Sequence, residues 1–392
     1  MGKTKREPSR EESFHKHYAA IWGEKRWTES LYPALLQPTR HAALINYALP
    51  PSHFDGILAD AGIAPEDLES IPMPSDSTNG VERASRTVYL AKRLSSAPYE
   101  QSARGTLLPS PRLSGHSDRK SSLMSHWNMD AASILAAKLL NVVPGDAVLD
   151  LCASPGGKSI ALAQGLFLPA NDQSSTETSG SLLCSNETDK ARHRRLAENL
   201  KAYLPDRLSV KCTNIDATTP NAHRELATIR GWDKILVDAP CSSERHIIHA
   251  HAKAKASGDA APEMANWRPG STKRLQEIQF KLLMTALRLL KTEGKVLYAT
   301  CSIEPGENDG VIEKVLAQVE KERSKGLIRW SIQLAELSSF QKSSNGDGAS
   351  EVLERKWAER TKHGWIVLPD HPSGGRWGPL FFALLTKTPA EG

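Results

Sequence analysis

From about residue 125 onward, short apolar runs alternate with segments whose apolar residues recur at helical spacing. The runs with strand character cover residues 147–151, 181–185, 208–212, 234–238 and 295–300. The helical segments cover residues 130–140, 188–202, 271–291 and 306–321, and a further helix begins at Gly156. Short, nearly continuous apolar strands separated by helices are typical of a parallel sheet covered on both faces. We therefore predict an α/β fold with a doubly wound, mostly parallel sheet that binds ligands at the carboxyl ends of its strands.

Both ends of the chain depart from this alternation. Near the C-terminus, the apolar runs 364–368 and 379–386 flank a glycine-rich turn, which predicts an antiparallel hairpin at the sheet edge. Near the N-terminus, residues 13–70 have helical spacing interrupted by prolines. Polar stretches that we expect to form flexible linkers or loops cover residues 72–86, 94–122, 169–180 and 342–350. We predict a helical N-terminal region with linkers over residues 1–124 and one domain over residues 125–392.

Composition narrows the class of protein. The 392 residues carry a formal net charge of +5, which permits a polyanionic partner without requiring one. The chain has 5 cysteines and no C-x-x-C spacing, so we expect neither a disulfide framework nor a metal site. No uncharged apolar stretch approaches the roughly 18 residues that cross a bilayer, so we expect a soluble protein without membrane contact. Glu11 and Glu12 follow the basic start, which argues against a mitochondrial presequence and leaves the compartment open.

A glycine-rich turn follows the first predicted strand of the domain, directly after Asp150, and opens a helix. Its residues are Cys152, Ala153, Ser154, Pro155, Gly156, Gly157 and Lys158. Adjacent glycines let a backbone pass close to a ligand, although a tight packing turn explains such a pair about equally well. Acids follow the later strands at Glu187, Asp216 and Asp238, where they suit ribose hydroxyls and an adenine amine. Each acid taken singly is more often a helix cap or a solvated residue.

Two cysteines lie just beyond strand-like runs. Cys241 ends the segment Asp238-Ala239-Pro240-Cys241, and Cys301 lies in Thr300-Cys301-Ser302. Because parallel strands end at one edge of a sheet, we expect both thiols to lie near the cofactor turn. Cys184 and Cys212 are better explained as small buried hydrophobic residues, and Cys152 as a residue of the turn that contributes backbone and packing. Spacing alone does not say which thiol would attack a substrate.

These motifs, in this order, resemble those of the Sun-domain (RsmB/Nop-type) family of RNA cytosine-5 methyltransferases over roughly residues 125–387. The segments Met129–Ser133, Arg245-His246 and Gly378–Phe382 are most similar to the branch that methylates mitochondrial small-subunit ribosomal RNA. The resemblance implies a class I (Rossmann-like) methyltransferase domain over residues 125–392 that uses S-adenosylmethionine. This chain has Ser154 where alanine is usual, Glu187 where aspartate is common, and a long insert at 252–268.

The resemblance also implies roles for individual residues. Cys301 would add to carbon 6 of cytosine, Cys241 would help to release the methylated product, and Asp238 would hydrogen-bond the ring. Lys158 would position Asp238 or the base. The cofactor would lie against Cys152, Ala153, Ser154, Pro155, Gly156, Gly157, Lys158, Glu187, Asp216 and Asp238.

A basic stretch follows Cys241 on the side where substrate is expected. Its candidate RNA contacts are Arg245, His246, Lys253, Lys255 and Arg268, with Lys273 and Arg274 beyond them. Trp267 is a candidate for stacking on an unpaired base. A solvated charged loop explains any one of these residues at least as well.

The expected activity is methylation of carbon 5 of a cytosine in RNA, with ribosomal RNA as the first candidate substrate. Two alternatives stay open: a transfer RNA substrate, and a catalytically silent RNA-binding factor for ribosome assembly. DNA methylation is disfavoured because the Thr300-Cys301-Ser302 segment has no role in it. By resemblance we expect a mitochondrial location, otherwise the nucleus or cytosol, and a protein partner that confers specificity.

Overall fold

The computed structural model describes residues 8–64, 68–71, 89–92, 108–114, 122–167, 180–259, 261–334 and 349–390. The predicted linker 72–86 lies outside the described residues, as do most of 94–122 and most of the predicted loops 169–180 and 342–350.

A nine-stranded sheet forms the centre of the molecule. Its parallel strands are β5 (Ala147–Asp150), β6 (Leu182–Asn186), β7 (Ser209–Thr213), β8 (Trp232–Asp238) and β9 (Leu290–Thr300). The sheet order is β11-β12-β13-β9-β8-β5-β6-β7, with β10 paired to β13. β5 lies between β6 and β8 with all three strands parallel, and β9 continues the sheet parallel to β8. The predicted doubly wound, mostly parallel sheet is confirmed, and its strands fall within a few residues of the predicted runs.

The C-terminal strands are antiparallel, but they extend further than a hairpin at the edge. They are β10 (Trp330–Leu334), β11 (Glu359–Arg360), β12 (Trp365–Val367) and β13 (Leu380–Pro389). β12 pairs with β13 as predicted, yet β13 lies inside the sheet between β12 and β9 and also pairs with β10. Residues 380–385 of β13 are all buried, as expected for a strand with neighbours on both sides.

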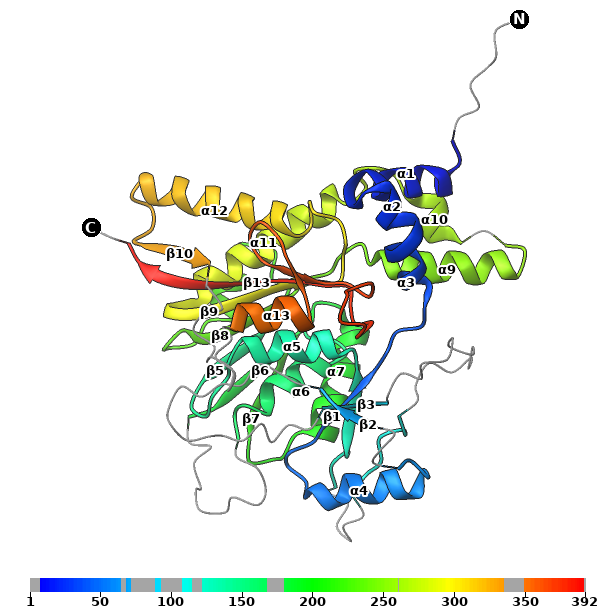
Figure 1. Cartoon of the computed structure of the whole chain (residues 1–392). Coiled ribbons are helices and arrows are strands. Elements are labelled where there is room, and N and C mark those ends of the chain that lie inside the picture. Colours follow the sequence, from blue (N-terminus) through cyan, green and yellow to red (C-terminus); the bar gives the residue numbers. More distant parts are fainter. Residues whose placement is uncertain are drawn as a thin grey trace, which may run out of the picture.

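Helices cover both faces of this sheet (Figure 1). They are α5 (Ala131–Leu139), α6 (Gly157–Ala163), α7 (Lys190–Tyr203), α8 (Ala222–Glu225), α9 (Glu244–Ala256), α10 (Pro262–Asn266), α11 (Lys273–Leu289), α12 (Asp309–Ser324) and α13 (Ala349–Lys356). Side chains of α5, α6 and α7 pack into one apolar cluster, and those of α11 and α12 pack into a second cluster. Helix periodicity explains this division, since α11 buries Leu282, Leu283, Ala286 and Leu287 on one face.

The N-terminal region contains helices and a small sheet. The helices are α1 (Arg10–Trp22), α2 (Glu24–Arg26), the π-helix η1 (Trp27–Leu31), α3 (Tyr32–Leu36) and α4 (Pro51–Asp60). The strands β1 (Ala42–Ile45), β2 (Leu68–Ser70), β3 (Tyr89–Lys92) and β4 (His126–Met129) form an antiparallel sheet in the order β2-β3-β1-β4. The helical prediction for Ala43 and Leu44 was therefore wrong, because a run of four apolar residues fits a strand as well as a helix. β4 follows residue 124 and pairs with β1, so this sheet joins residues on both sides of the predicted boundary.

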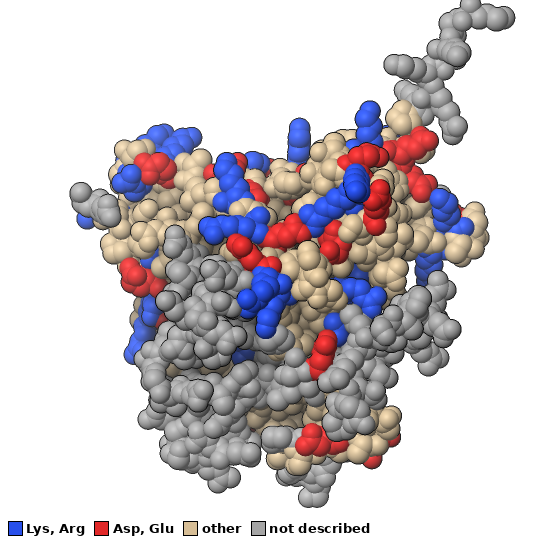
Figure 2. All heavy atoms as spheres, viewed as in Figure 1, with Lys and Arg blue, Asp and Glu red and all other residues tan. Residues whose placement is uncertain are grey.

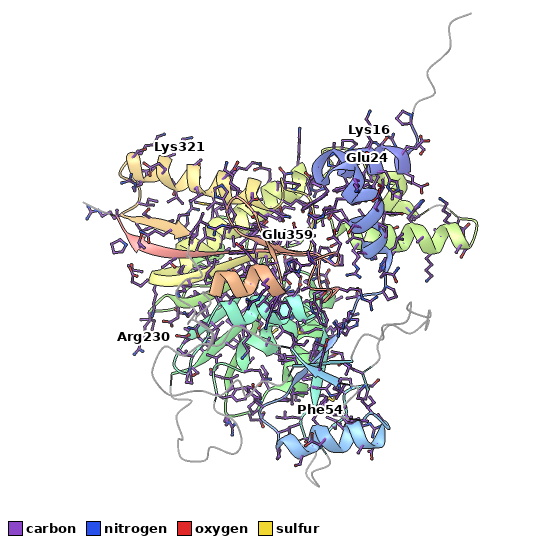
Figure 3. All side chains as sticks on the ribbon, in the orientation of Figure 1. Lys16, Glu24, Phe54, Arg230, Lys321 and Glu359 are labelled. Carbon is purple, nitrogen blue, oxygen red and sulfur yellow. The ribbon has the colours of Figure 1, made fainter. Side chains whose placement is uncertain are left out.

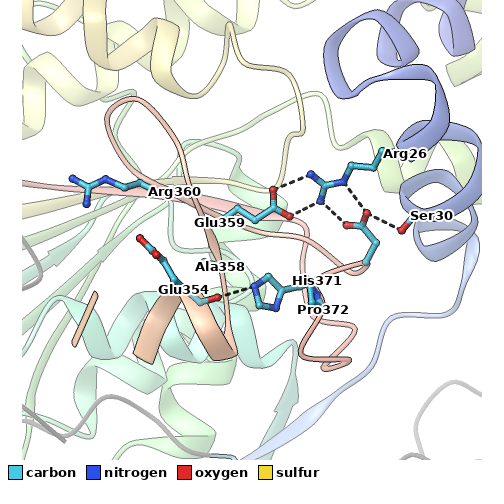
Figure 4. A pocket seen from close by; sticks show the side chains of 9 residues that line it. Arg26, Ser30, Glu354, Ala358, Glu359, Arg360, His371 and Pro372 are labelled. Atoms are coloured by element: carbon cyan, nitrogen blue, oxygen red, sulfur yellow. Dashed lines mark hydrogen bonds and ion pairs between the residues drawn. The ribbon is translucent and has the colours of Figure 1, made fainter. Parts of the chain in front are cut away.

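A helical cap, which we define as α1, α2, η1, α3, α9 and α10, lies at one end of the molecule (Figure 1). Figure 3 places Lys16 and Glu24 in this cap, at the opposite end of the molecule from Phe54 on α4. Trp267 packs against Phe14 and Tyr18, with ring centroids 5.1 and 6.0 Å apart. Arg26 ties the cap to the C-terminal segment by ion pairs with Glu359 of β11 and Asp370, which follows β12 (Figure 4).

Candidate active site

The ends of β5, β8 and β9 bring the predicted motifs together. These strands are neighbours and parallel, with Asp150 in register with Leu236 and Asp238 in register with Ala299. Their carboxyl ends therefore lie at one edge of the sheet. The glycine turn, Cys241 and Cys301 all follow directly from this edge.

The two thiols are in contact but have different environments. Cys241 Sγ lies 3.1 Å from Cys301 Sγ, and Ser243 Oγ lies 3.0 Å from Cys301 Sγ. Cys301 is exposed, whereas Cys241 is half-buried. The hydrogen bond from the Cys241 thiol lowers the pKa of Cys301, and the Ser243 hydroxyl and Lys158 lower it further. The same hydrogen bond between the two thiols, together with burial, raises the pKa of Cys241 well above its ordinary value. Cys301 is thus the more readily ionised thiol of the pair.

Lys158 and Asp238 form an ion pair beside these thiols. Lys158 Nζ lies 2.8 Å from Asp238 Oδ2, and the side chains are 14% and 30% exposed. Burial opposes the charged form of Lys158, but the attraction of Asp238 outweighs it and raises the pKa of the lysine. Lys158 comes from the glycine turn after β5 and Asp238 from the end of β8. The pair therefore links the predicted cofactor turn to the thiol site.

The glycine turn is held against α7. Gly156 has a φ of +118°, a conformation that glycine adopts without steric cost. A Cβ on Gly157 would lie 2.7 Å from Trp127 Nε1, so the turn and β4 approach closely at this residue. From α7, Asn199 Nδ2 donates a 2.7 Å hydrogen bond to the carbonyl of Pro155.

Buried carboxyls surround this turn. Asp150 is fully buried and accepts a 2.7 Å hydrogen bond from Ser159 Oγ through Oδ2, while its Oδ1 has no partner among the described residues. Burial raises the pKa of Asp150 to about 7. Glu187 is 4% exposed, accepts from the backbone N–H of Asp189 and lies 3.3 Å from Arg192. Asp150 Oδ1 lacks a donor, and a carboxylate such as Glu187 can accept from hydroxyl groups, so the two residues fit the ammonium and ribose groups of S-adenosylmethionine.

Asp216 and Cys152 make contacts within their own turns, and neither has a contact that identifies a bound cofactor. Asp216 is exposed, and its Oδ1 accepts from the backbone N–H and the hydroxyl of Thr218. This is the turn-capping geometry that the sequence also allowed, and it leaves the adenine contact a prediction. Cys152 is half-buried, and burial raises its pKa well above the ordinary value. A neutral thiol there is consistent with a packing role.

Arg245 and Trp267 are buried by contacts within the protein, which corrects the expectation that they contact RNA. Arg245 is 8% exposed, and its guanidinium donates to the carbonyls of Gly378 and Gln37. The backbone N–H of Gly378 in turn donates to Asp130 Oδ2 at 2.9 Å. The three segments behind the finer resemblance thus meet in one contact. Trp267 is 4% exposed within the aromatic cluster of the cap, so it is not available to stack on a base.

The basic candidates of α9 lie on the surface of the helical cap, and Arg268 follows α10. His246 is 72% exposed, Lys253 is exposed, and Arg268 donates to the carbonyls of Ala265 and Trp267. Lys255 forms a 3.1 Å ion pair with Glu11. In the view of Figure 2, positive and negative side chains are intermingled over the described surface. RNA contacts by these residues therefore stay a prediction.

Four polar side chains that the sequence analysis missed lie directly behind the cysteines. Ser242 and Glu244 follow Cys241, and Ser302 and Glu307 follow Cys301. Glu244, Ser302 and Glu307 are all 0% exposed. The available signal was an acid shortly after each cysteine, but an acid in a polar turn is usually solvated.

Two findings limit other kinds of site. No three histidine, cysteine or acidic residues in the described ranges are arranged to hold a metal ion. Among the described helices, none has the length and apolar character needed to cross a membrane.

The doubly wound sheet, the glycine turn at its carboxyl edge and the thiol pair beside that turn fit the class I methyltransferases. The model of the 16S rRNA methyltransferase RsmB/F family matches residues 137–347, and the chain belongs to this family. Its members are S-adenosylmethionine-dependent RNA cytosine-5 methyltransferases, so the resemblance read from the motifs is confirmed at the level of the family.

Relatives with two kinds of RNA substrate match this chain. The mitochondrial tRNA (cytosine(34)-C(5))-methyltransferase of Mus musculus is 30% identical over 280 residues, covering 70% of this chain and 68% of the relative. The 5-cytosine rRNA methyltransferase NSUN4 of Bos taurus is 31% identical over 229 residues, covering 56% of this chain and 51% of the relative. The matched regions thus span from about half to two thirds of these relatives.

Solved structures confirm the fold. NSun6 from Pyrococcus horikoshii, crystallised with SFG, aligns with a TM-score of 0.59 at 16% identity and covers 95% of this chain and 97% of that chain. A methyltransferase homologue from the same organism aligns with a TM-score of 0.54 at 19% identity, covering 95% of this chain and 94% of that chain.

Proposed function

We propose that this protein methylates carbon 5 of a cytosine in ribosomal RNA and that Cys301 is the nucleophile. The observation that carries the assignment is the asymmetry of the thiol pair. Cys301 is exposed and has a lowered pKa, whereas Cys241 is half-buried and has a raised pKa. A thiolate is the attacking form of cysteine, so the attack falls to Cys301.

The residues divide the reaction between them. The Cys301 thiolate forms a bond to carbon 6, which makes carbon 5 nucleophilic. When bound, S-adenosylmethionine supplies the methyl group that carbon 5 takes up. Removal of the carbon 5 proton by a base then returns the electrons that expel the Cys301 thiolate. Cys241 Sγ lies 3.1 Å from the sulfur that must leave, so its thiol can donate a hydrogen bond to the departing Cys301 thiolate.

Asp238 and Lys158 are proposed to position the cytosine and to favour the thiolate form of Cys301. We propose that Asp238 accepts from the amino group of cytosine while Lys158 keeps the aspartate in place at 2.8 Å. The positive charge of Lys158 also lowers the pKa of Cys301. Asp150 and Glu187 are the residues proposed to bind the ammonium and ribose groups of the cofactor, and Asp216 its adenine.

The substrate and the cell compartment belong to the same proposal. A NSUN4 rRNA relative favours ribosomal RNA, while the mitochondrial tRNA relative makes transfer RNA the alternative. Relatives with mitochondrial names support a mitochondrial location. We also propose that residues 125–392 form the catalytic domain and that residues 1–124 form a separate N-terminal region. A partner protein is proposed to confer specificity. Bisulfite sequencing of RNA from cells with and without the protein identifies the RNA that it methylates. Methylation of that RNA by the purified protein, with and without proteins that co-purify with it, tests the need for a partner.

Substitution of each cysteine tests the assignment of the nucleophile. With S-adenosylmethionine and substrate RNA, Cys301→Ala should abolish methylation and form no adduct. Cys241→Ala should instead accumulate a covalent RNA–protein adduct on denaturing gels. Cys212→Ala, a half-buried thiol on β7, is the matched control and should behave as wild type. An adduct that depends on Cys241 and forms without Cys301 would reverse the roles.

A further inference from the structure

A buried pair of carboxyl groups lies behind the two cysteine loops and has no part in the steps above. Glu244 begins α9, three residues after Cys241, and Glu307 precedes α12, six residues after Cys301. Both side chains are 0% exposed. An isolated carboxylate is costly to bury, so such a pair must be compensated by hydrogen bonds or protons.

Each carboxyl group holds a different loop. Glu244 Oε2 accepts a 3.0 Å hydrogen bond from the backbone N–H of Ile303, on the Cys301 loop. Glu307 Oε2 accepts a 3.1 Å hydrogen bond from the backbone N–H of Ser242, on the Cys241 loop. The two acids thus bind crosswise, since each one follows one cysteine and holds the loop of the other. This arrangement joins both thiol loops.

The supporting donors come from more distant elements. Tyr18 of α1 donates a 3.0 Å hydrogen bond to Glu244 Oε1. Gln279 of α11 donates to Glu307 Oε2 at 2.6 Å and to the carbonyl of Pro240 at 2.9 Å. These hydrogen bonds connect the carboxyl pair, and through it both cysteine loops, to the core and to the helical cap.

The oxygen–oxygen contacts between Ser242 and the two acids outnumber the hydrogen atoms that Ser242 can donate. Ser242 Oγ is in hydrogen-bonding contact with both Glu244 Oε1 and Glu307 Oε1. A serine hydroxyl donates one hydrogen. If both carboxyls were ionised, one of these oxygen–oxygen contacts would have no hydrogen and would be repulsive. Ser302 Oγ, 3.3 Å from each of the same oxygens, also has one hydrogen to donate.

We propose that Glu244 and Glu307 share one proton, and that this singly protonated pair positions Cys241 and Cys301 in contact. The role rests on the proposed function only for its effect on methylation. Both acids are positioning residues, because they act on the thiols through the loops. Loss of the shared proton would place two negative charges across Ser242, and the loops would separate.

The electrostatic surroundings agree with a bound proton. Burial, with the charge of Glu244 adding to it, raises the pKa of Glu307 to about 7, and burial also raises the pKa of Glu244. The other titratable groups nearby are Tyr18, Tyr298, Cys241, and Glu304 with its partner His17. Among the described residues, no lysine or arginine forms an ion pair with either acid, so no cation favours their ionisation.

The sign of the pH effect follows from linkage. The pKa of Glu307 is raised in the folded protein, so its contribution to stability is complete below the ordinary carboxyl pKa and is lost as pH rises through about 7. Glu307→Gln keeps an N–H donor where the proton would be and cannot lose it. Glu307→Ala has no donor at any pH.

The test is urea unfolding of the full chain between pH 5.5 and 8.5, with methylation measured in parallel. We expect the wild-type urea midpoint to fall as pH rises through this range. Glu307→Gln should show a smaller fall and keep its methylation to higher pH, so that its activity relative to wild type rises with pH. Glu307→Ala should lose at least about tenfold in activity at every pH. Asp150, whose pKa burial also raises to about 7, is present in every variant, so the difference between variants isolates Glu307.

Glu277→Gln, an exposed acid on α11, is the matched control and should follow the wild-type profile. If Glu307→Gln is as impaired as Glu307→Ala, or if its midpoint has the wild-type pH dependence, the shared proton is rejected. A wild-type protein that does not methylate RNA would reject the proposed function instead, because the unfolding profiles do not depend on methylation.

Discussion

The carboxyl edge of the large sheet and the helical cap are built in different ways. At the edge, each functional residue follows its own strand within a few positions, so the chain itself brings Asp150, Asp238 and Thr300 together. The cap is assembled from two segments far apart in the chain. Arg245 reaches the carbonyl of Gln37, His249 reaches that of Leu35, and Lys255 pairs with Glu11.

This difference explains what each region contributes. Strand-end motifs supply reacting groups, since short loops hold side chains close to a rigid sheet. The cap supplies support from a distance: Tyr18 donates to Glu244, and His17 lies 2.7 Å from Glu304 on the Cys301 loop. A substitution at the edge should therefore impair the chemistry, while one in the cap should change stability or binding.

Lys158→Met should have the largest effect of the variants that separate these regions. It leaves Asp238 without its cation and removes the charge that lowers the pKa of Cys301. We expect about a hundredfold loss of methylation, the usual scale for a lost electrostatic partner. The acid limb of the pH–rate profile should also move to higher pH, because the thiol then ionises less readily.

Lys158→Arg is the control that keeps the charge, and its acid limb should stay near that of wild type. Lys362→Met removes an exposed lysine paired with Glu313 and should leave the rate unchanged. An unmoved acid limb in Lys158→Met would show that the edge does not tune Cys301 through this charge.

Tyr18→Phe should have a smaller effect, on stability first. It removes the hydroxyl that donates to Glu244 at 3.0 Å and keeps the aromatic packing against Trp27 and Trp267. The expected loss is about 1 kcal/mol of the free energy of unfolding, measured by urea titration. Tyr32→Phe, in the same cap, is the control, because the Tyr32 hydroxyl has no hydrogen bond to another described residue.

Combining Tyr18→Phe with Glu244→Gln sharpens this prediction. If the hydroxyl acts through the carboxyl, the double variant should lose less stability than the two single losses added together. Strict additivity would mean that Tyr18 supports the cap without supporting the active site.

The same contrast between local and distant contacts determines which parts of the structure the sequence could predict. The parallel strands, the glycine turn and the thiol pair follow from local patterns, and the structure places Cys241 and Cys301 in contact. The strand β1 was missed because four apolar residues have no distinctive period, and it is stabilised by pairing with β4 some eighty positions away.

The cap contacts could not be predicted from local patterns. The basic character of Arg245 and the aromatic character of Trp267 suggested RNA, but burial depends on which distant segment packs against them. Here that segment is residues 10–37, which no motif links to α9 and α10. Glu244 and Glu307 were missed for the same reason, since only the fold removes them from water.

The smallest effect is expected from the exposed cations of the cap, where Lys253→Ala combined with Arg268→Ala tests RNA contact. If both residues contact phosphates, RNA binding should weaken and the slope of log K against log salt should become shallower by about 1.4. Unfolding and cofactor binding should not change. The matched control is Lys321→Ala with Lys325→Ala, at the end of α12 away from the cap, where Figure 3 labels Lys321. If both pairs of substitutions change the slope equally, the cap attracts RNA only through the net charge of the protein; a change confined to the first pair places RNA on the cap.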